Sequence, residues 1–370
     1  MIRSWFIPFS ERLGMRRQQQ LPKRTLLSLM AIFLVALLSN FLANDPQKSF
    51  FPPLIPYSAK KLDAANSPFF SPFSTQNIPS VYQRHWLGTD ELGRDVTAGL
   101  IAGTQTALLI GVGGVLLALL IGLPIGLTAG YYGDNRLEMN IWALILRGGI
   151  LLLLLFYFFV FLNLKESSLW ILIKLLIFYI STELIINILQ NYILNKFKIL
   201  SKKIIVPLDI IVMRIVDIMQ SIPFILWILG TLTIVKHLSL ASLILLIGIT
   251  SWVSFTRLVR GEMIRIRQLE FMEAAEVIGA STMRIILRHA LPNVLTPVLI
   301  AFSFGIANGV LLEAFLSFIG LGLAAEEVTW GTMLMAARTD FGNWWMAIFP
   351  GIAIFITVYT FNRLGEVLTE

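Results

Sequence analysis

Few residues of this 370-residue chain have a type and spacing that suit catalysis. The absence of cysteine excludes a disulfide framework, an iron-sulfur cluster and a thiolate zinc site. The three histidines, His85, His237 and His289, fall on different predicted segments, and none has a metal-like neighbour in the sequence. The chain also lacks the G-x-x-x-x-G-K-[ST] phosphate loop, so ATP hydrolysis would have to belong to another subunit. No set of nucleophile, base and metal ligands supports an enzyme.

A polar stretch from Glu273 to Asn293 instead has residue types that suit binding to a partner. Glu273, Ala274 and Ala275 place one charge beside two small side chains, which permits close approach to a groove. Gly279 then breaks or tightly turns the helix, and Pro292 can open the next apolar segment. The stretch reads as an amphipathic helix-turn-helix between two apolar segments. In a membrane protein, a polar helical loop of this kind is expected to bind a partner in the aqueous phase.

The composition places this loop in a membrane protein. The chain is 56% hydrophobic and only 14% charged, which is more apolar surface than a soluble fold covers. Eight apolar stretches approach the ~20 residues that cross a bilayer as a helix. They cover residues 25–44, 101–129, 141–163, 168–190, 207–235, 238–256, 294–322 and 345–361. The fold class is therefore all-α and polytopic, with about eight transmembrane helices.

Loop charges predict the orientation. Basic residues precede the first span, and two later loops, around Lys198 and from Arg257 to Arg288, are also basic. The positive-inside rule then places both termini in the cytoplasm, and this also accounts for the net charge of +7 without nucleic acid. The first apolar stretch is longer than a usual signal core, and Phe41 and Leu42 make a poor cleavage site, so we expect an uncleaved anchor rather than a cleaved signal peptide.

The outward segment between the first two spans has two parts. Residues 44–80 are rich in Pro, Ser and Phe and should be irregular. The string HWLGTDELGRDV follows from His85 to Val96, where Gly88 and Gly93 permit a turn and the charged residues can pair with one another near a helix start. On physical grounds alone, this string is a salt-bridged turn at a membrane entrance.

Taken together, these blocks resemble a known family. The stretch from Glu273 resembles the EAA loop of ATP-binding-cassette (ABC) importer permeases. The strings LGTDELGRD, VDIMQSIPFIL from Val216, EAFLSFIGLGL from Glu313 and WGTMLMAAR from Trp330 are similar to successive blocks of the C-type permease subunit of dipeptide, oligopeptide and nickel importers. The resemblance covers most of residues 80–365 in the family's order.

The resemblance implies a type I importer permease fold, partners and sites. The partners would be a second homologous permease, two ABC ATPase subunits and an extracytoplasmic solute-binding protein, all at the bacterial inner membrane, with no cofactor. ATP-driven closure of the ATPases would act through the loop. The coupling residues would be Glu273, Ala274, Ala275, Gly279, Arg288, His289, Leu291 and Pro292.

The domain boundaries follow from these assignments. Residues 1–44 form the cytoplasmic N-terminus and anchor, 45–98 the extracytoplasmic segment and 99–370 the permease domain, with the coupling loop at 257–293. Residues 135–206 depart from the family pattern, because two extra apolar runs separate GYYGD from the segment at Leu208. An even number of added spans keeps the downstream orientation, so we interpret them as an inserted, lipid-facing hairpin of structural role.

Four polar residues within the predicted spans are candidates for the translocation path: Asp217, Gln220, Asn308 and Glu313. Helix-helix hydrogen bonding is the ordinary role for Gln and Asn, whereas a carboxylate in a span is costly and more often functional. An alternative reading is a secondary transporter or channel that needs no ATPase. It explains the spans but gives the coupling loop no purpose.

Overall fold

The structure, a computed structural model, describes residues 23–45, 53–63, 66, 69–78, 80–140, 203–235, 238–324, 327–338 and 342–369. The chain divides into two compact units. One consists of Met1–Tyr131 and Ile215–Glu370, and the other of Tyr132–Arg214.

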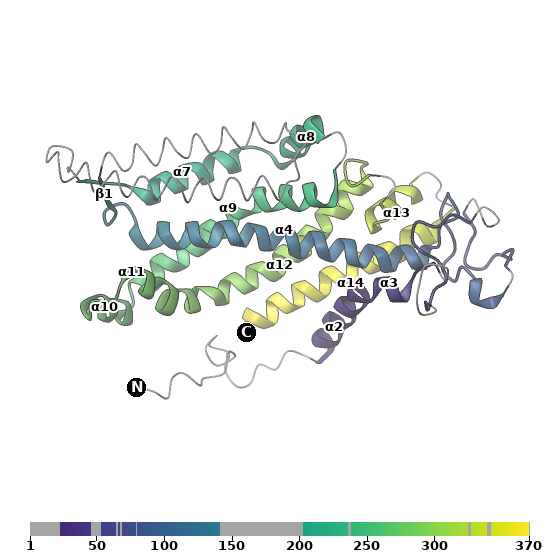
Figure 1. Cartoon of the computed structure of the whole chain (residues 1–370), viewed down its shortest axis with the longest axis horizontal. Coiled ribbons are helices and arrows are strands. Elements are labelled where there is room, and N and C mark those ends of the chain that lie inside the picture. The colour runs from purple at the N-terminus through teal and green to yellow at the C-terminus, as the bar shows by residue number, and fades with distance from the viewer. Residues whose placement is uncertain are drawn as a thin grey trace. The chain divides into compact units, whose positions relative to one another are not determined.

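The first unit is a bundle of long apolar helices (Figure 1). Its elements are α2 (Lys23–Leu37), α3 (Ser39–Leu42), the 3-10 helix η3 (Val81–Gln83), α4 (Val96–Tyr132), α8 (Phe224–Val235), α9 (Leu240–Arg267), α10 (Glu270–Val277), α11 (Thr282–Arg284), the π-helix η5 (Ile285–Ala290), α12 (Leu291–Phe318), α13 (Trp330–Ala337) and α14 (Trp344–Thr369). Among the described residues, four helices are long and apolar enough to cross a membrane: Val96–Tyr132, Leu240–Arg267, Thr282–Phe318 and Trp344–Thr369. The all-α, multi-pass prediction is confirmed.

Glycines on α4 allow α9 to pack directly against its backbone. A Cβ at Gly122 would lie 2.7 Å from the carbonyl oxygen of Trp252, and a Cβ at Gly126 would lie 2.7 Å from the Cβ of Val259. Gly130 is equally close to Met263. Membrane helices associate largely through such van der Waals contacts, because lipid is as apolar as the side chains and provides no hydrophobic driving force for helix association. The result is a seam between two helices that run in the same direction.

α12 runs the opposite way along another face of α4. A Cβ at Gly309 would lie 3.0 Å from the Cα of Gly111, so the two backbones touch. α14 packs on α12 as well, with Gly365 against the ring of Phe304. Near the start of α4, the indole N–H of Trp330 in α13 donates to the carbonyl of Leu100 in α4, at 3.0 Å. α4 and α12 are therefore the centre of the bundle.

The apolar run at 207–235 differs from a single straight span. α7 (Leu208–Ser221) ends just before Pro223, and α8 begins at Phe224 with its axis bent by 76°. Proline has no N–H to donate, and its ring disfavours the helical conformation of the preceding residue, Ile222. Such a bent pair of apolar helices forms either a broken span or a re-entrant loop.

The end of the next span, α9, also differs from its predicted position. α9 continues to Arg267, ten residues past Arg257, where the sequence placed the start of the coupling loop. Arg257, Arg260 and Arg265 are compatible with a helix, so the change from apolar to charged composition does not end it. The turn region of the loop is correspondingly shorter.

The second unit holds the two ends of the inserted segment. Strands β1 (Glu138–Asn140) and β2 (Lys203–Ile205) pair antiparallel, with Asn140 opposite Lys203. Next to this pair, the Asp134 carboxylate accepts from the Ile210 N–H at 3.0 Å in the first turn of α7. The two ends of the insertion therefore meet. The hairpin predicted between them, residues 141–202, lies outside the described residues.

Candidate coupling surface and translocation face

The predicted coupling residues lie on a short helix and a tight turn between α9 and α12. Glu273 and Ala274 are exposed on α10, whereas Ala275 and its neighbour Met272 are buried beneath it. Gly279 follows with φ +79, a conformation that favours glycine, and a Cβ there would meet no atom within 4 Å. The turn is closed by the Ala280 N–H, which donates to the Ala275 carbonyl at 3.1 Å. α10 thus presents its polar edge to solvent.

Two hydrogen bonds tie this region to the end of α4. The Tyr131 hydroxyl donates to the Glu276 carboxylate at 3.3 Å, and the Arg267 guanidinium donates to the Tyr131 carbonyl at 2.9 Å. Glu276 of α10 is therefore bonded to the end of α4, and Arg267 joins the end of α9 to the same turn of α4. The chain continues from α10 through α11 and η5 into α12.

The turn exposes apolar side chains, and the sequence analysis missed them. Val277 and Ile278 are 87% and 85% exposed, and Met283 and Leu287 are 67% and 52% exposed. We call these four residues the loop patch. Exposed apolar side chains gathered on a polar loop are typical of an interaction site. The signal in the sequence was Val277 and Ile278 directly before Gly279, in a loop that is otherwise charged.

The remaining predicted coupling residues lie where the loop joins α12. Arg288 is exposed and His289 half-buried in η5, a π-helical turn of a kind often found at functional sites. Leu291 and Pro292 are the first two residues of α12, which continues η5 as one helix from Thr282 to Phe318, so Pro292 lies directly after the π-helical turn. All eight predicted coupling residues are therefore within one continuous segment, although Ala275 is covered.

The four predicted path residues do not share one cavity. Asp217 is half-exposed and forms a 2.7 Å ion pair with Arg257 of α9. Gln220, one turn further along α7, lines a hollow of about 260 Å³ with Pro223 and Ser254. Glu313 is fully buried, and its Oε1 accepts from the Ser317 hydroxyl at 2.8 Å, which ties it to its own helix. Glu313 lines neither this hollow nor the one that holds Asn308.

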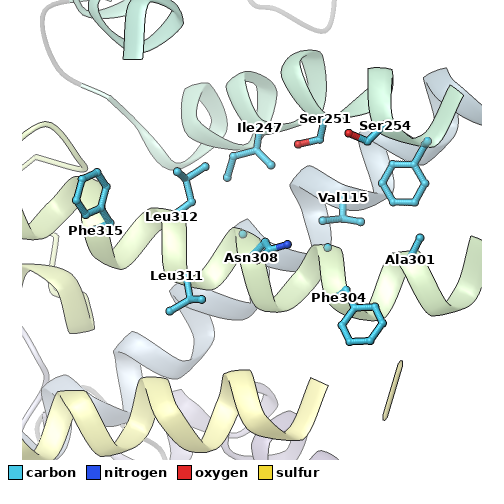
Figure 2. Close-up of a pocket in the computed structure, with 13 residues that line it drawn as sticks. Val115, Ile247, Ser251, Ser254, Ala301, Phe304, Asn308, Leu311, Leu312 and Phe315 are labelled. Carbon is cyan, nitrogen blue, oxygen red and sulfur yellow. The ribbon is translucent and has the colours of Figure 1, made fainter. Parts of the chain in front are cut away.

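Asn308 lines a second hollow, of about 670 Å³, between α4, α9 and α12 (Figure 2). Its polar groups are Asn308, Ser251 and Ser254, and its walls include Phe304, Leu312 and Phe315. The volume lies in the range of roughly 300–1,000 Å³ that small-molecule sites occupy, and a few polar groups among apolar walls are also usual there. Ser254 lines both hollows, so they adjoin on one face of α9.

The described residues form no cluster of metal ligands. Across the described ranges, no three His, Asp or Glu side chains are grouped in a way that would hold a metal ion.

Comparison with known proteins identifies the family. The model of the binding-protein-dependent transport system inner membrane component matches residues 203–369. The glutathione transport system permease protein GsiD of Pectobacterium atrosepticum is 30% identical over 287 residues, which are 77% of this chain and 71% of GsiD. The chain belongs to the ABC importer permeases of the dipeptide and oligopeptide type.

Two further relatives of this ABC importer permease are similar over a larger share of the chain. The dipeptide transport system permease protein DppC of Bacillus subtilis is 28% identical over 316 residues, 83% of this chain and 76% of DppC. The oligopeptide transport system permease protein OppC of the same organism is 28% identical over 320 residues, 84% of this chain and 80% of OppC. Permeases of this family work with an ATPase and a solute-binding protein.

Proposed function

We propose that this permease imports peptides or related small solutes, and that ATPase subunits drive it through α10 and the loop patch. The solute class rests on the relatives, whose names specify dipeptide, oligopeptide and glutathione transport. The full assembly would contain a second homologous permease, two ATPases and an extracytoplasmic binding protein. It would sit in the bacterial inner membrane with both termini of this chain in the cytoplasm.

The exposed loop patch is the observation that carries the coupling proposal. Burying Val277, Ile278, Met283 and Leu287 against a partner would remove apolar surface from water, worth roughly 25 cal/mol per Å². Glu273 beside the small Ala274 leaves room for a partner groove and adds one charge for orientation. We therefore assign the predicted coupling residues of α10 and the loop patch to the ATPase interface.

Mechanical transmission follows from the contacts at the ends of the spans. An ATPase that moves α10 would move the end of α4 through the Tyr131–Glu276 hydrogen bond, and α12 through the continuous η5 segment. α12 carries Asn308 and one wall of the larger hollow. Tilting α12 against α9 would thus change the hollow, which we assign to the translocation path together with Gln220 and the Asp217–Arg257 pair. Differential binding of ATP to two states is sufficient to drive the exchange.

The test is the energy source of uptake in cells that produce the complete importer. We expect uptake of a radiolabelled dipeptide or of labelled glutathione to stop when ATP is depleted. It should persist when an uncoupler collapses the proton gradient while ATP is maintained. Uptake that follows the proton gradient instead would favour a secondary transporter.

A charge reversal tests the interface itself. Glu273→Lys should leave membrane insertion intact, reduce recovery of the ATPase with the tagged permease and abolish uptake. Glu262→Lys is the matched control, because Glu262 is on α9, is half-buried and already pairs with Arg265 at 2.7 Å. Equal ATPase recovery from both variants would contradict the assignment of Glu273.

A further inference from the structure

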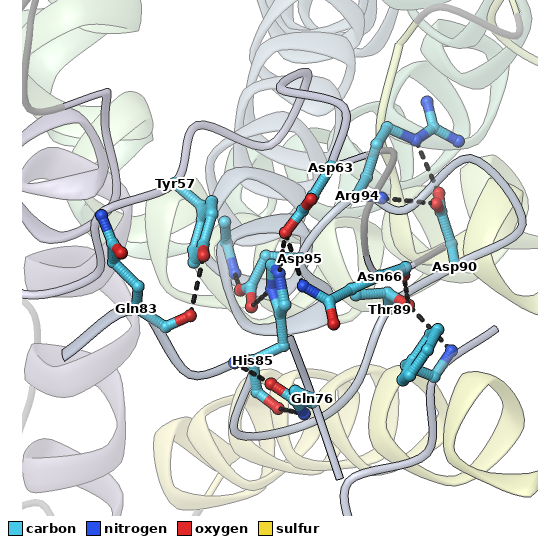
Figure 3. A network of polar contacts seen from close by, with 12 residues as sticks. Tyr57, Asp63, Asn66, Gln76, Gln83, His85, Thr89, Asp90, Arg94 and Asp95 are labelled. Carbon is cyan, nitrogen blue, oxygen red and sulfur yellow. Dashed lines mark hydrogen bonds and ion pairs between the residues drawn. The ribbon is translucent and has the colours of Figure 1, made fainter. Parts of the chain in front are cut away.

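The extracytoplasmic segment before α4 contains a buried histidine between two aspartates (Figure 3). The His85 side chain is fully buried, and the ring of Tyr57 stacks on it with 4.2 Å between centroids. The backbone of His85 is held as well. Its N–H donates to the Gln76 side-chain oxygen at 2.8 Å, and its carbonyl accepts from the Gln76 amide at 2.9 Å. The imidazole is therefore held in one place.

Each ring nitrogen of His85 faces a carboxylate oxygen. Nδ1 lies 2.8 Å from Oδ2 of Asp95, and Nε2 lies 3.1 Å from Oδ2 of Asp63. A neutral imidazole has only one N–H, and an ionised carboxylate can only accept. The neutral ring would leave a nitrogen lone pair against a carboxylate. Only the imidazolium, with two N–H groups, satisfies both contacts.

Both carboxylates have further donors that favour their ionised forms. Oδ1 of Asp95 accepts from the Ala98 N–H at 2.7 Å, which caps the positive end of α4. Oδ2 of Asp63 also accepts from the Asn66 amide at 2.8 Å. The proton shared in this cluster therefore belongs on His85 rather than on an aspartate.

The electrostatics agree with the geometry. Burial opposes charge on His85, but the hydrogen bonds and negative charges of Asp95 and Asp63 outweigh it and raise the pKa of the imidazole above its ordinary value. Burial, with the charges of Asp63 and Asp95, raises the pKa of Tyr57 to about 12, so its hydroxyl stays neutral. Nearby, Arg94 and Asp90 pair with each other. The groups that face the imidazole are thus Asp63, Asp95 and the neutral Tyr57.

This cluster joins parts of the chain that must keep their relative position at the outward end. Asp95 caps α4, while Asp63 lies in the segment before it and donates its N–H to the Gly93 carbonyl at 3.2 Å. The same turn accepts a hydrogen bond from α14, because the indole N–H of Trp345 donates to the Thr89 carbonyl at 3.1 Å. The outward ends of α4 and α14 are therefore linked through a segment that His85 pins.

We propose that His85 is a positioning residue that, as an imidazolium, holds the extracytoplasmic segment to α4 through its hydrogen bonds to Asp63 and Asp95. We call these two hydrogen bonds the pin. When the external medium becomes alkaline enough to deprotonate His85, the pin loosens and import weakens. Because the pKa of His85 is raised in the folded state, this contribution is fully present below the ordinary pKa of histidine. It is lost as the pH rises through the raised value. The cluster acts only through the position of the spans and touches no solute.

The test uses single cysteines in the full importer, because the natural chain has none. Val96→Cys reports opening of the pin, since Val96 at the start of α4 is only 1% exposed. Phe73→Cys, at a residue 83% exposed, corrects for the pH dependence of thiol reactivity. We expect the labelling rate at 96, relative to 73, to rise above the pKa of His85 by up to about tenfold per pH unit, the limit for one linked proton. A ratio that stays flat from neutral to alkaline pH would overturn the proposal.

Asp63→Asn separates the charge argument from a merely structural role. The asparagine side chain can donate to a neutral imidazole, so both ring nitrogens stay satisfied without the extra proton. We expect this variant to import at neutral pH and to lose the alkaline rise in labelling at 96. His85→Gln, which cannot donate to both carboxylates, should already show rapid labelling at neutral pH. An alkaline rise in Asp63→Asn equal to that of the natural chain would refute the pin.

Nitrogen NMR provides an independent readout. In protein labelled with 15N-histidine, the His85 signals are those missing from the His85→Gln spectrum. We expect both ring nitrogens to be protonated at neutral pH, and one to lose its proton in Asp63→Asn. A neutral His85 ring at neutral pH in the natural chain would contradict the proposal whatever the labelling shows.

Discussion

Replacing Gly279 by Val should weaken ATPase binding without unfolding the bundle. The backbone at Gly279 has φ +79, and a left-handed conformation costs a residue with a Cβ roughly 1–2 kcal/mol. A Cβ there meets no atom within 4 Å, so the backbone strain is the whole cost. Such a change lowers the equilibrium constant for the binding-competent turn about 5- to 30-fold. The apparent Kd for the ATPase rises by up to the same factor, since binding needs that turn.

The assay is titration of the purified ATPase onto the permease in nanodiscs, with a matched control. Gly261→Val adds the same side chain in open space, but in the regular helix of α9. It should leave the apparent Kd unchanged. Gly279→Asn should fall between Val and Gly, because asparagine tolerates the left-handed region. Equal affinities for Gly279→Val and Gly261→Val would refute the reasoning that the turn geometry presents the interface.

Three further predictions concern the bundle, the insertion and the topology. Gly126→Leu should lower the thermal unfolding temperature in detergent, because overpacking the α4–α9 seam costs about 1–3 kcal/mol. Gly230→Leu, in open space, should leave that temperature unchanged. Equal unfolding temperatures for the two variants would contradict the close packing of α4 on α9. Deleting residues 141–202 and joining β1 to β2 by an Asn-Gly turn should keep substantial uptake, since the strand ends already pair; complete loss with normal assembly would give the insertion a role in transport. An impermeant thiol reagent added outside intact cells should label Phe73→Cys but not Ile278→Cys, and labelling of both would overturn the orientation.

The long apolar helices were predictable because their length and composition must match the bilayer. α4, α12 and α14 fall where hydropathy put them, and the described residues of the Pro-rich segment before α4 are as irregular as its prolines suggested. The break at Pro223 was not seen, because hydropathy averages over a proline inside an apolar run. α9 passed its predicted end at 256 because arginines are good helix formers.

Side-chain pairs between residues far apart in the sequence could not be predicted from sequence patterns. Asp95 was expected to pair within its own turn, but its partner His85 also contacts Asp63, 22 residues earlier in the Pro-rich part. Asp217 was predicted in the path, and no sequence pattern indicated its ion pair with Arg257, which was placed in the loop. Each pair joins segments whose relative register is set by packing, and no local periodicity records it.

The central claim is that this permease is driven by an ATPase that binds the loop patch. The direct measurement is the ATP hydrolysis that co-purifies with the tagged permease from membranes in mild detergent, compared between the natural chain and Ile278→Asp. Placing a charge in the loop patch should remove both the ATPase subunit and its activity, while the permease itself still inserts and purifies. ATPase activity that stays with Ile278→Asp at the natural level would contradict the account.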